Sequence, residues 1–308
     1  MDRTRGRKLI AGGCALLAFG IVATVAISWD RGNVGAAAKV DPGVALASEA
    51  AKARAEVPTA VPTPTGEPTE VPSAPPQPAV VTRNRLYQVG RLPASRCAEP
   101  VREPTSPANV RAYYTEFVAC LNKAWAPAIR KAGFTFVPPR LVVTVGQSAS
   151  SPCDGADGED YYCHGAIYID ARNDLEAYKH DDPGLVMMYM AFVIAHEYGH
   201  HVQALTGILA VRYQRRATIN GLEATLEESR RLELQASCLG AVYFGADKDW
   251  FPVDDLWIAD FESLVSNVND PERDHGKAES HRHWSMAGLD SASPASCNTY
   301  TADSPQVS

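Results

Sequence analysis

Hydrophobic residues recur with helical spacing at several places in the C-terminal two thirds of the chain. Residues 113–131 form the first such stretch, and the positions that share one side of the expected helix are Tyr114, Phe117, Val118, Leu121 and Trp125. Residues 221–244 are charged in their first half and apolar in their second, and residues 254–267 again place large apolar side chains on one face. Each pattern predicts a helix with one face in a core.

The most apolar stretch of this region has signals at both ends. Asp182-Pro183 is typical of a helix start, because a carboxylate can cap the first free amides and proline fits the first helical position. We expect the helix to run over residues 184–205 and to stop at Gly207.

Two short runs have the composition of β-strands. Residues 141–145 are rich in β-branched side chains and follow Pro138-Pro139, and residues 166–170 repeat the pattern shortly after Cys163. The expected fold class is therefore α+β and mostly helical, with a small sheet near the start of one folded domain at residues 85–308.

The first 29 residues have the pattern of a membrane-targeting segment. Basic residues cluster in positions 3–8, and the 21 residues from 9 to 29 carry no charge. A helix of that length crosses a hydrocarbon core of about 30 Å. We therefore predict a single-pass anchor in the cell membrane, with a cytoplasmic N-terminus and an extracytoplasmic domain. Ala26-Ile27-Ser28 also suits a signal peptidase, so secretion after cleavage is the alternative.

Residues 30–84 have the composition of a disordered stalk. Alanine, glycine and valine dominate the first half, and eight prolines lie between Val57 and Ala79. Proline at this density removes amide donors and favours an extended chain. The segment is expected to act as a spacer between the membrane and the folded domain.

Charge and composition narrow the class of partner. The chain has a formal net charge of -7, with 45% hydrophobic and 21% charged residues, which is ordinary for a chain that buries a core. A nucleic-acid binder would need a basic face to neutralise phosphates, so no nucleic-acid partner is expected.

The chemistry is concentrated in His196-Glu197-Tyr198-Gly199-His200, inside the most apolar predicted helix. Positions i and i+4 share a helix face, so His196 and His200 can bind one cation together, with Glu197 beside them to take a proton from water. Zinc suits two imidazoles and supplies hydrolytic chemistry. The next residue, His201, points to another face and is expected to be solvated or to support the site from outside.

A catalytic zinc site needs a third protein ligand. Glu233 is the best candidate, because it lies on a later predicted helix whose next turn is apolar. Glu227 and Glu228 are alternatives, although their surroundings look like a solvated helix face.

These motifs resemble those of a known family, the bacterial YpfJ-like neutral zinc metallopeptidases. The similarity covers roughly residues 140–300 in order, and the segments that carry it are 196–203, 233–236, Tyr161-Tyr162-Cys163 with 167–170, Asn269-Asp270, His275-Gly276, Trp284 and 297–300. The resemblance implies a zincin-like fold and a gluzincin-like ligand set, with zinc on His196, His200 and Glu233. It also implies a protein or peptide substrate.

Two departures from the family pattern stand out. Ser237 occupies a position where the family usually has aspartate, one helical turn after Glu233 and so close to the predicted metal. A serine hydroxyl orients a ligand imidazole more weakly than a carboxylate does, and Asp270 is one candidate to replace it. The second departure, His164-Gly165-Ala166 where Pro-Ala-Asp is usual, is expected to affect only a loop.

The expected mechanism assigns Glu197 as the base that activates water for attack on a peptide carbonyl. The oxyanion that forms needs a donor besides the metal, and His275 is the candidate, from its glycine neighbour and its family match. Capping of the following helix is the alternative role for His275. His281 and His283 are expected at the surface.

Three interpretations compete at this point. The first is an extracytoplasmic zinc peptidase. The second is a catalytically impaired zinc-binding scaffold on the cell surface that docks a partner, motivated by Ser237. The third is a purely structural domain without metal. Metal content separates the third from the others, and a Glu197→Gln comparison separates the first two.

Six cysteines follow the predicted membrane helix, as expected for a disulfide-permissive compartment. Locality along the chain favours three pairs among the possible connectivities: Cys97–Cys120, Cys153–Cys163 and Cys238–Cys297. None of these residues has the Cys-x-x-Cys spacing typical of a structural zinc site.

Overall fold

The computed structural model describes residues 75–146, 153 and 159–308. The predicted membrane helix at 9–29 and the stalk up to residue 74 lie outside this range. Within it, no helix is both long and apolar enough to cross a bilayer.

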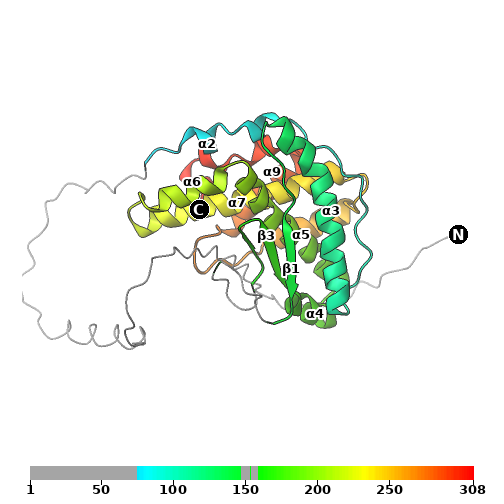
Figure 1. Ribbon diagram of the computed structural model, residues 1–308. Helices are drawn as coiled ribbons and strands as arrows, with labels where there is room; N and C mark the ends of the chain where they lie inside the picture. Colours follow the sequence, from blue (N-terminus) through cyan, green and yellow to red (C-terminus); the bar gives the residue numbers. More distant parts are fainter. Residues whose placement is uncertain (1–74, 147–152, 154–158) are drawn as a thin grey trace, which may run out of the picture. The chain divides into compact units, whose positions relative to one another are not determined.

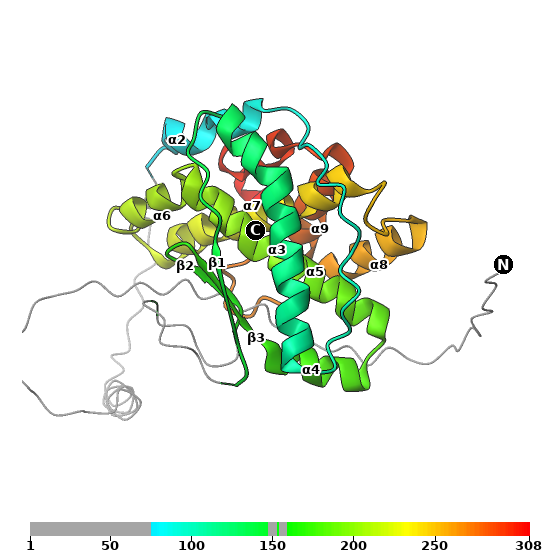
Figure 2. The same cartoon turned by 45° about the vertical axis from the view of Figure 1, so that its right-hand side comes forward.

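The described part is mostly helical, with one small sheet, as expected (Figures 1 and 2). Its helices are α2 (Ala79–Thr82), α3 (Pro107–Lys131), α4 (Ala171–His180), α5 (Pro183–Leu205), α6 (Ile208–Arg216), α7 (Leu222–Asp247), α8 (Asp255–Val265) and α9 (Ala278–Ser291). The strands are β1 (Arg140–Thr144), β2 (Tyr161–Cys163) and β3 (Ala166–Asp170). Short 3-10 turns are η1 (Arg85–Gln88), η2 (Pro294–Cys297), η3 (Thr299–Thr301) and η4 (Ser304–Val307).

The sheet has the strand order β1-β3-β2. β1 runs parallel to β3, with Leu141 opposite Ile167, and β2 runs antiparallel to β3, with Tyr162 opposite the same Ile167. The chain therefore returns along β3 directly after β2, through the turn at His164-Gly165, where both residues have positive φ.

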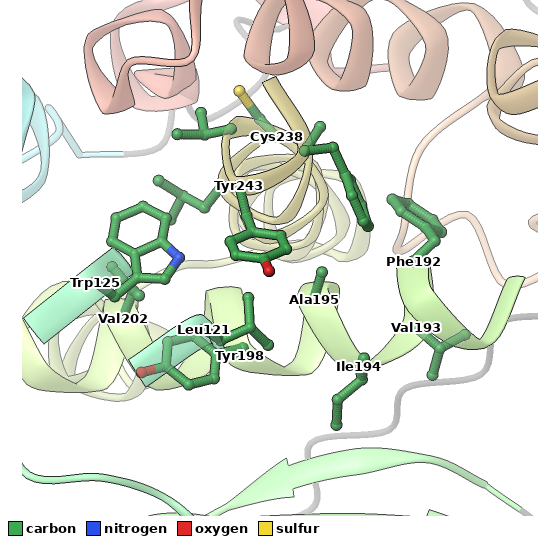
Figure 3. Packing of buried hydrophobic residues seen from close by; sticks show 14 of the residues in the cluster. Leu121, Trp125, Phe192, Val193, Ile194, Ala195, Tyr198, Val202, Cys238 and Tyr243 are labelled. Carbon is green, nitrogen blue, oxygen red and sulfur yellow. The ribbon is translucent and has the colours of Figure 1, made fainter. Parts of the chain in front are cut away.

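Helix α5 is the centre of the core. Its C-terminal two thirds are buried around the whole circumference, because α3 and α7 pack on it and the sheet lies on another side (Figure 3). Figure 3 shows Leu121 and Trp125 of α3, Ala195 and Val202 of α5, and Tyr243 of α7 in this layer. Each large apolar side chain buried here stabilises the fold by about 1.5–3 kcal/mol relative to an exposed position. A helix so enclosed places every group it carries in an apolar surrounding.

Two glycines let α5 and α7 approach closely. A Cβ atom at Gly199 would lie 2.5 Å from the carbonyl oxygen of Ala236, and one at Gly240 would lie 2.9 Å from the carbonyl carbon of Ala195. Neither position tolerates a side chain without a shift of backbone. The close crossing brings the middle of α7 against the motif-bearing turn of α5.

The predicted elements agree with these boundaries to within a few residues, apart from the start of α3. The helix at 113–131 begins earlier, at Pro107, because Ser106 caps it by accepting a hydrogen bond from the Asn109 amide. Asp182 caps α5 as predicted, accepting from the Gly184 and Leu185 amides. The sequence pattern did not predict α4 or α6, whose apolar stripes are short and interrupted by charges. The helix expected after His275, for which no bounds were predicted, is α9.

The end of the predicted stalk belongs to the folded unit. The Arg215 guanidinium donates to the carbonyl oxygens of Pro75 and Pro76, and the Gln77 amide donates to Glu228. Asn84, which is buried, donates to the Thr206 carbonyl oxygen. Residues 75–84, predicted as the end of the stalk, are therefore held on the folded unit: Arg215 of α6 binds backbone carbonyl oxygens, and Glu228 of α7 binds the Gln77 side chain.

All three predicted disulfides form: Cys97–Cys120, Cys153–Cys163 and Cys238–Cys297. The first links the segment before α3 to that helix, and the second joins β2 to the loop before it. The third ties η2, near the C-terminus, to the middle of α7.

Candidate metal centre

Three buried side chains meet where α5 crosses α7. His196 and His200 extend from successive turns of α5, and Glu233 extends from α7. The Nε2 atoms of the two histidines lie 3.1 Å apart. Oε2 of Glu233 lies 3.3 Å from Nε2 of His196 and 3.0 Å from Nε2 of His200. The structure therefore brings the three predicted ligands together.

This donor set fits a zinc ion. Zinc in tetrahedral sites binds nitrogen and oxygen at about 2.0–2.2 Å, which places neighbouring ligand atoms about 3.3 Å apart. The separations of 3.0–3.3 Å observed here are close to that value. All three residues are buried, and an anionic oxygen that faces two imidazoles in an apolar surrounding is stabilised by a cation. His196, His200 and Glu233 can thus hold a metal.

The alternative carboxylates are occupied elsewhere. Glu227 pairs with Arg231 at 2.7 Å, one turn along the same helix. Glu228 pairs with Arg215 at 3.1 Å and is buried, so the expected solvated surrounding is wrong for this residue.

The protonation of the three groups is uneven. Burial lowers the pKa of His196 to about 4. Burial also acts to lower the pKa of His200, but the neighbouring Glu233 carboxylate outweighs it and raises this pKa to about 9. For Glu233, burial acts to raise the pKa, whereas the charge of His200 and hydrogen bonds from both imidazoles hold it well below its usual range. One proton is therefore shared by His200 and Glu233, and a metal must displace it.

The outer nitrogens of the two imidazoles have different partners. Nδ1 of His196 lies 3.0 Å from the Ser237 hydroxyl, as expected if Ser237 supports the metal site. Nδ1 of His200 lies 2.9 Å from Oε1 of Gln203. Asp270, considered as a replacement carboxylate near Ser237, instead accepts hydrogen bonds from the Asp274, His275 and Gly276 amides.

Glu197 lies beside the ligands and is 1% exposed. Its Oε2 atom is buried and has no hydrogen-bond partner among the residues that the structure describes. Burial raises the pKa of Glu197 to about 8, so the carboxyl group can exchange a proton near neutral pH. A group with these properties suits general acid–base chemistry.

His275 reaches the same site from the loop between α8 and α9. Its Nε2 atom is buried, lies 3.8 Å from Oε2 of Glu233 and has no hydrogen-bond partner within the described part of the chain. Its Nδ1 atom is 2.7 Å from Asp274. Burial acts to lower the pKa of His275, but Asp274 and Glu233 raise it to about 9. The alternative role is wrong, since the N-cap of α9 is Lys277 and has no side-chain cap.

Two other histidines are buried. For His201 the solvated alternative is wrong, and the alternative that it supports the site from outside stays a prediction: its Nε2 donates to the Val137 carbonyl oxygen at 2.8 Å, and its Nδ1 lies 3.2 Å from the Tyr162 hydroxyl. His281 is also buried, on the face of α9 toward the core, and burial lowers its pKa to about 3. His283 is exposed as predicted. The burial of His281 was not predicted because its charged neighbour Arg282 obscured the apolar face of the helix.

Comparison with known proteins matches the part of the chain that carries the three candidate ligands. A family model described as "Putative neutral zinc metallopeptidase" matches residues 88–259, more than half of the 308-residue chain, including the whole of α5 and α7. The chain belongs to this family. His275 and His281 lie beyond the matched region, so the family match says nothing about them.

Individual relatives extend the comparison. The uncharacterized protein YpfJ of Escherichia coli strain K12 is 27% identical over 203 residues, which cover 59% of this chain and 69% of the relative. The uncharacterized protein Rv2575 of Mycobacterium tuberculosis strain H37Rv is 31% identical over 134 residues, which cover 36% of this chain and 44% of the relative. No solved structure matches the chain.

Proposed function

We propose that this member of the neutral zinc metallopeptidase family is an extracytoplasmic, zinc-dependent peptidase that hydrolyses peptide bonds in proteins or peptides. The observation that carries the proposal is the buried triad of His196, His200 and Glu233, with the unpaired Glu197 oxygen beside it. Family membership supports the metal and the class of reaction.

The side chains divide the chemistry between them. When bound, zinc lowers the pKa of a water molecule and polarises a substrate carbonyl. Glu197 takes the proton of the attacking water and passes it to the departing amine, for which a pKa of about 8 is well placed. His275 keeps Nδ1 on Asp274 and carries a proton on Nε2, which it can donate to the developing oxyanion.

The location is proposed from the sequence, with support from the disulfides. Residues 9–29 would anchor the chain in the cell membrane, and residues 30–74 would space the domain from it. Three disulfides favour an oxidising compartment on the outer side. Protease treatment of intact cells should release a fragment that begins in the stalk, whereas a protected domain would place it in the cytoplasm.

The test of function compares the full-length wild type with Glu197→Gln. Glu197→Gln keeps the shape and removes the base, so one zinc per chain should remain while peptide hydrolysis falls by about 100-fold or more. Cleavage-site mapping on a proteome-derived peptide mixture gives the readout. Glu176→Gln, on the exposed face of α4, is the control and should behave as wild type. Full activity of Glu197→Gln would contradict the proposed mechanism.

A second candidate is a zinc-binding scaffold with impaired catalysis. The contact that favours it is the Ser237 hydroxyl at His196, where the family pattern leads one to expect a carboxylate. This candidate predicts zinc in the wild type and in Glu197→Gln alike, with no cleavage by either.

A further inference from the structure

Two glutamines behind the metal centre form a hydrogen-bonded chain that begins at His200. We propose that Gln203 and Gln235 are positioning residues that hold His200 in the tautomer able to bind zinc through Nε2. We name this chain of contacts the amide relay. The inference rests on the zinc site proposed above, and it names the residues that fix the tautomer of one of its ligands.

The contacts of the amide relay are continuous and buried. Oε1 of Gln203 lies 2.9 Å from Nδ1 of His200, and Nε2 of Gln203 donates to the Leu232 carbonyl oxygen at 2.8 Å. The same Nε2 donates to Oε1 of Gln235 at 3.2 Å. Nε2 of Gln235 donates to the Cys297 carbonyl oxygen at 2.9 Å. Neither glutamine side chain has access to solvent, so water cannot take over these bonds.

The backbone carbonyls give the relay its direction. A carbonyl oxygen only accepts hydrogen bonds, so the Leu232 oxygen requires the NH₂ group of Gln203. The Cys297 oxygen likewise requires the NH₂ group of Gln235, which leaves Oε1 of Gln235 toward Gln203. Both requirements orient Gln203 the same way, with its oxygen toward His200.

The orientation of Gln203 then decides the tautomer of His200. An amide oxygen only accepts, so Nδ1 of His200 must carry the hydrogen and donate it. Nε2 is left as the nitrogen whose lone pair can face a cation at the Glu233 side. A flipped Gln203 amide would set oxygen against the Leu232 oxygen and NH₂ against Nδ1, which would put the hydrogen of a neutral His200 on Nε2. The carbonyl oxygens of Leu232 and Cys297 thus select the nitrogen of His200 that can bind the metal.

The relay also connects distant segments of the chain. Gln235 donates to the Tyr87 hydroxyl at 2.8 Å, and this hydroxyl donates to the Val81 carbonyl oxygen at 2.9 Å. Cys297 is held in place by its disulfide to Cys238 on α7. The N-terminal turns α2 and η1 and the C-terminal turn η2 therefore share the far end of the relay.

The test measures zinc affinity of the full-length protein by competition with a chelator, using Zn²⁺ alone as the probe. Gln203→Met keeps the volume but removes both hydrogen-bonding groups, and should weaken zinc binding by about 10–100-fold. Gln203→Glu as the neutral acid keeps a carbonyl oxygen for His200 and an O–H donor for the Leu232 oxygen, and should stay within about tenfold of wild type. The zinc affinity of Gln235→Met should lie between those of Gln203→Met and Gln203→Glu, because the Leu232 carbonyl oxygen still orients Gln203. Gln214→Met, on the exposed side of α6, is the matched control and should have no effect.

If Gln203 only filled space, the order of the zinc affinities would be reversed: Gln203→Met would bind more tightly than Gln203→Glu, since methionine fills the buried space and a carboxylate disrupts it. Zinc affinity of Gln203→Met equal to wild type, or weaker binding by Gln203→Glu than by Gln203→Met, would overturn the proposal. The visible spectrum of the Co²⁺-loaded protein adds a readout of coordination, which should change in Gln203→Met and stay wild-type in Gln203→Glu. Should Gln203→Met fail to fold, a loss above about 100-fold in Gln203→Glu overturns the relay.

The two proposals fail differently. A wild type that binds no zinc refutes the proposed function and removes the purpose of the relay. A wild type that binds zinc, with Gln203→Met equally tight, refutes the relay alone.

Discussion

His196 and His200 are one turn apart on α5 and face the same Glu233 oxygen, yet the surroundings of their outer nitrogens differ. His196 meets a single hydroxyl, that of Ser237, which can either donate or accept. His200 meets an amide whose direction is fixed by two backbone carbonyls. The comparison shows that two histidines at positions i and i+4 can look equivalent in the sequence, while the fold fixes the tautomer of only one of them.

The largest expected effect comes from removing the charge that both histidines share. Glu233→Gln should weaken zinc binding by more than the roughly 100-fold typical of losing an outer hydrogen-bond partner. Without zinc, the pKa of His200 should fall from about 9 toward that of His196, because burial would then be opposed only by the Glu197 charge and the Gln203 hydrogen bond. Chelator competition and histidine titration by NMR give the two measurements. Glu227→Gln is the control on the same helix, and a His200 pKa that stays near 9 would refute this account.

The pH dependence of zinc binding follows from the difference between the pKa values of His200 and His196. Before metal binds, His200 is protonated below about pH 9 and His196 only below about pH 4. Zinc must displace the His200 proton, so affinity should rise about tenfold per pH unit from pH 6 to 8 and level off above 9. Competition titrations against a chelator of known proton affinity measure the slope. A flat profile over this range would mean that no ligand proton is displaced.

A glycine substitution tests whether the close helix crossing sets both environments at once. The Cβ atom of Gly199→Ala would meet the Ala236 carbonyl oxygen and push α7 away, together with Glu233 and Ser237. The free energy of unfolding should fall by about 1–3 kcal/mol, despite the better helix propensity of alanine. Urea unfolding measures the change. Gly184→Ala, at the exposed start of α5, puts its Cβ 3.1 Å from Oδ1 of Asp182, an exposed side chain that can shift, so it should cost less stability than Gly199→Ala. Equal losses for both would contradict the close-crossing argument.

The smallest expected effect is tighter zinc binding when the hydrogen-bond partner of His196 is made a carboxylate. Ser237→Asp gives Nδ1 a charged acceptor, which fixes the tautomer as the relay does for His200, and should tighten zinc binding by about tenfold. Turnover on any cleaved substrate should rise with it. Ser229→Asp, earlier on α7, serves as the control. Looser or unchanged zinc binding by Ser237→Asp would show that the hydroxyl already suffices.

The sequence predicted the parts of this site that helical periodicity determines. The spacing of His196 and His200 placed them on one face, and the turn from Glu233 to Ser237 placed that hydroxyl at the metal centre. The caps at Asp182 and Gly207 predicted the limits of α5 within two residues. All of these signals lie within one or two turns of a single helix.

The rest depended on contacts between distant segments. The partners of Gln203 and Gln235 include carbonyl oxygens, which any residue type can supply, so no side-chain pattern marks them. His281 was expected at the surface because its neighbour Arg282 is charged, and only the packing of α9 on α7 shows its burial. Two glycines inside predicted helices, Gly199 and Gly240, were the available signals of the close crossing, since glycine in a helix interior often has a packing reason.

His201 gives the metal centre a mechanical connection to the sheet. It follows His200 directly, and its ring bonds the Tyr162 hydroxyl on β2 and the Val137 carbonyl oxygen just before β1. Whatever restrains the last turns of α5 therefore also restrains one edge of the sheet. Zinc binding should slow local opening of β2, so that its amide hydrogens exchange more slowly with zinc than without it. The amide hydrogens of the helix α4 serve as the reference and should change less. Through the adjacent residues His200 and His201, binding of an ion to α5 is expected to restrain a strand of the sheet.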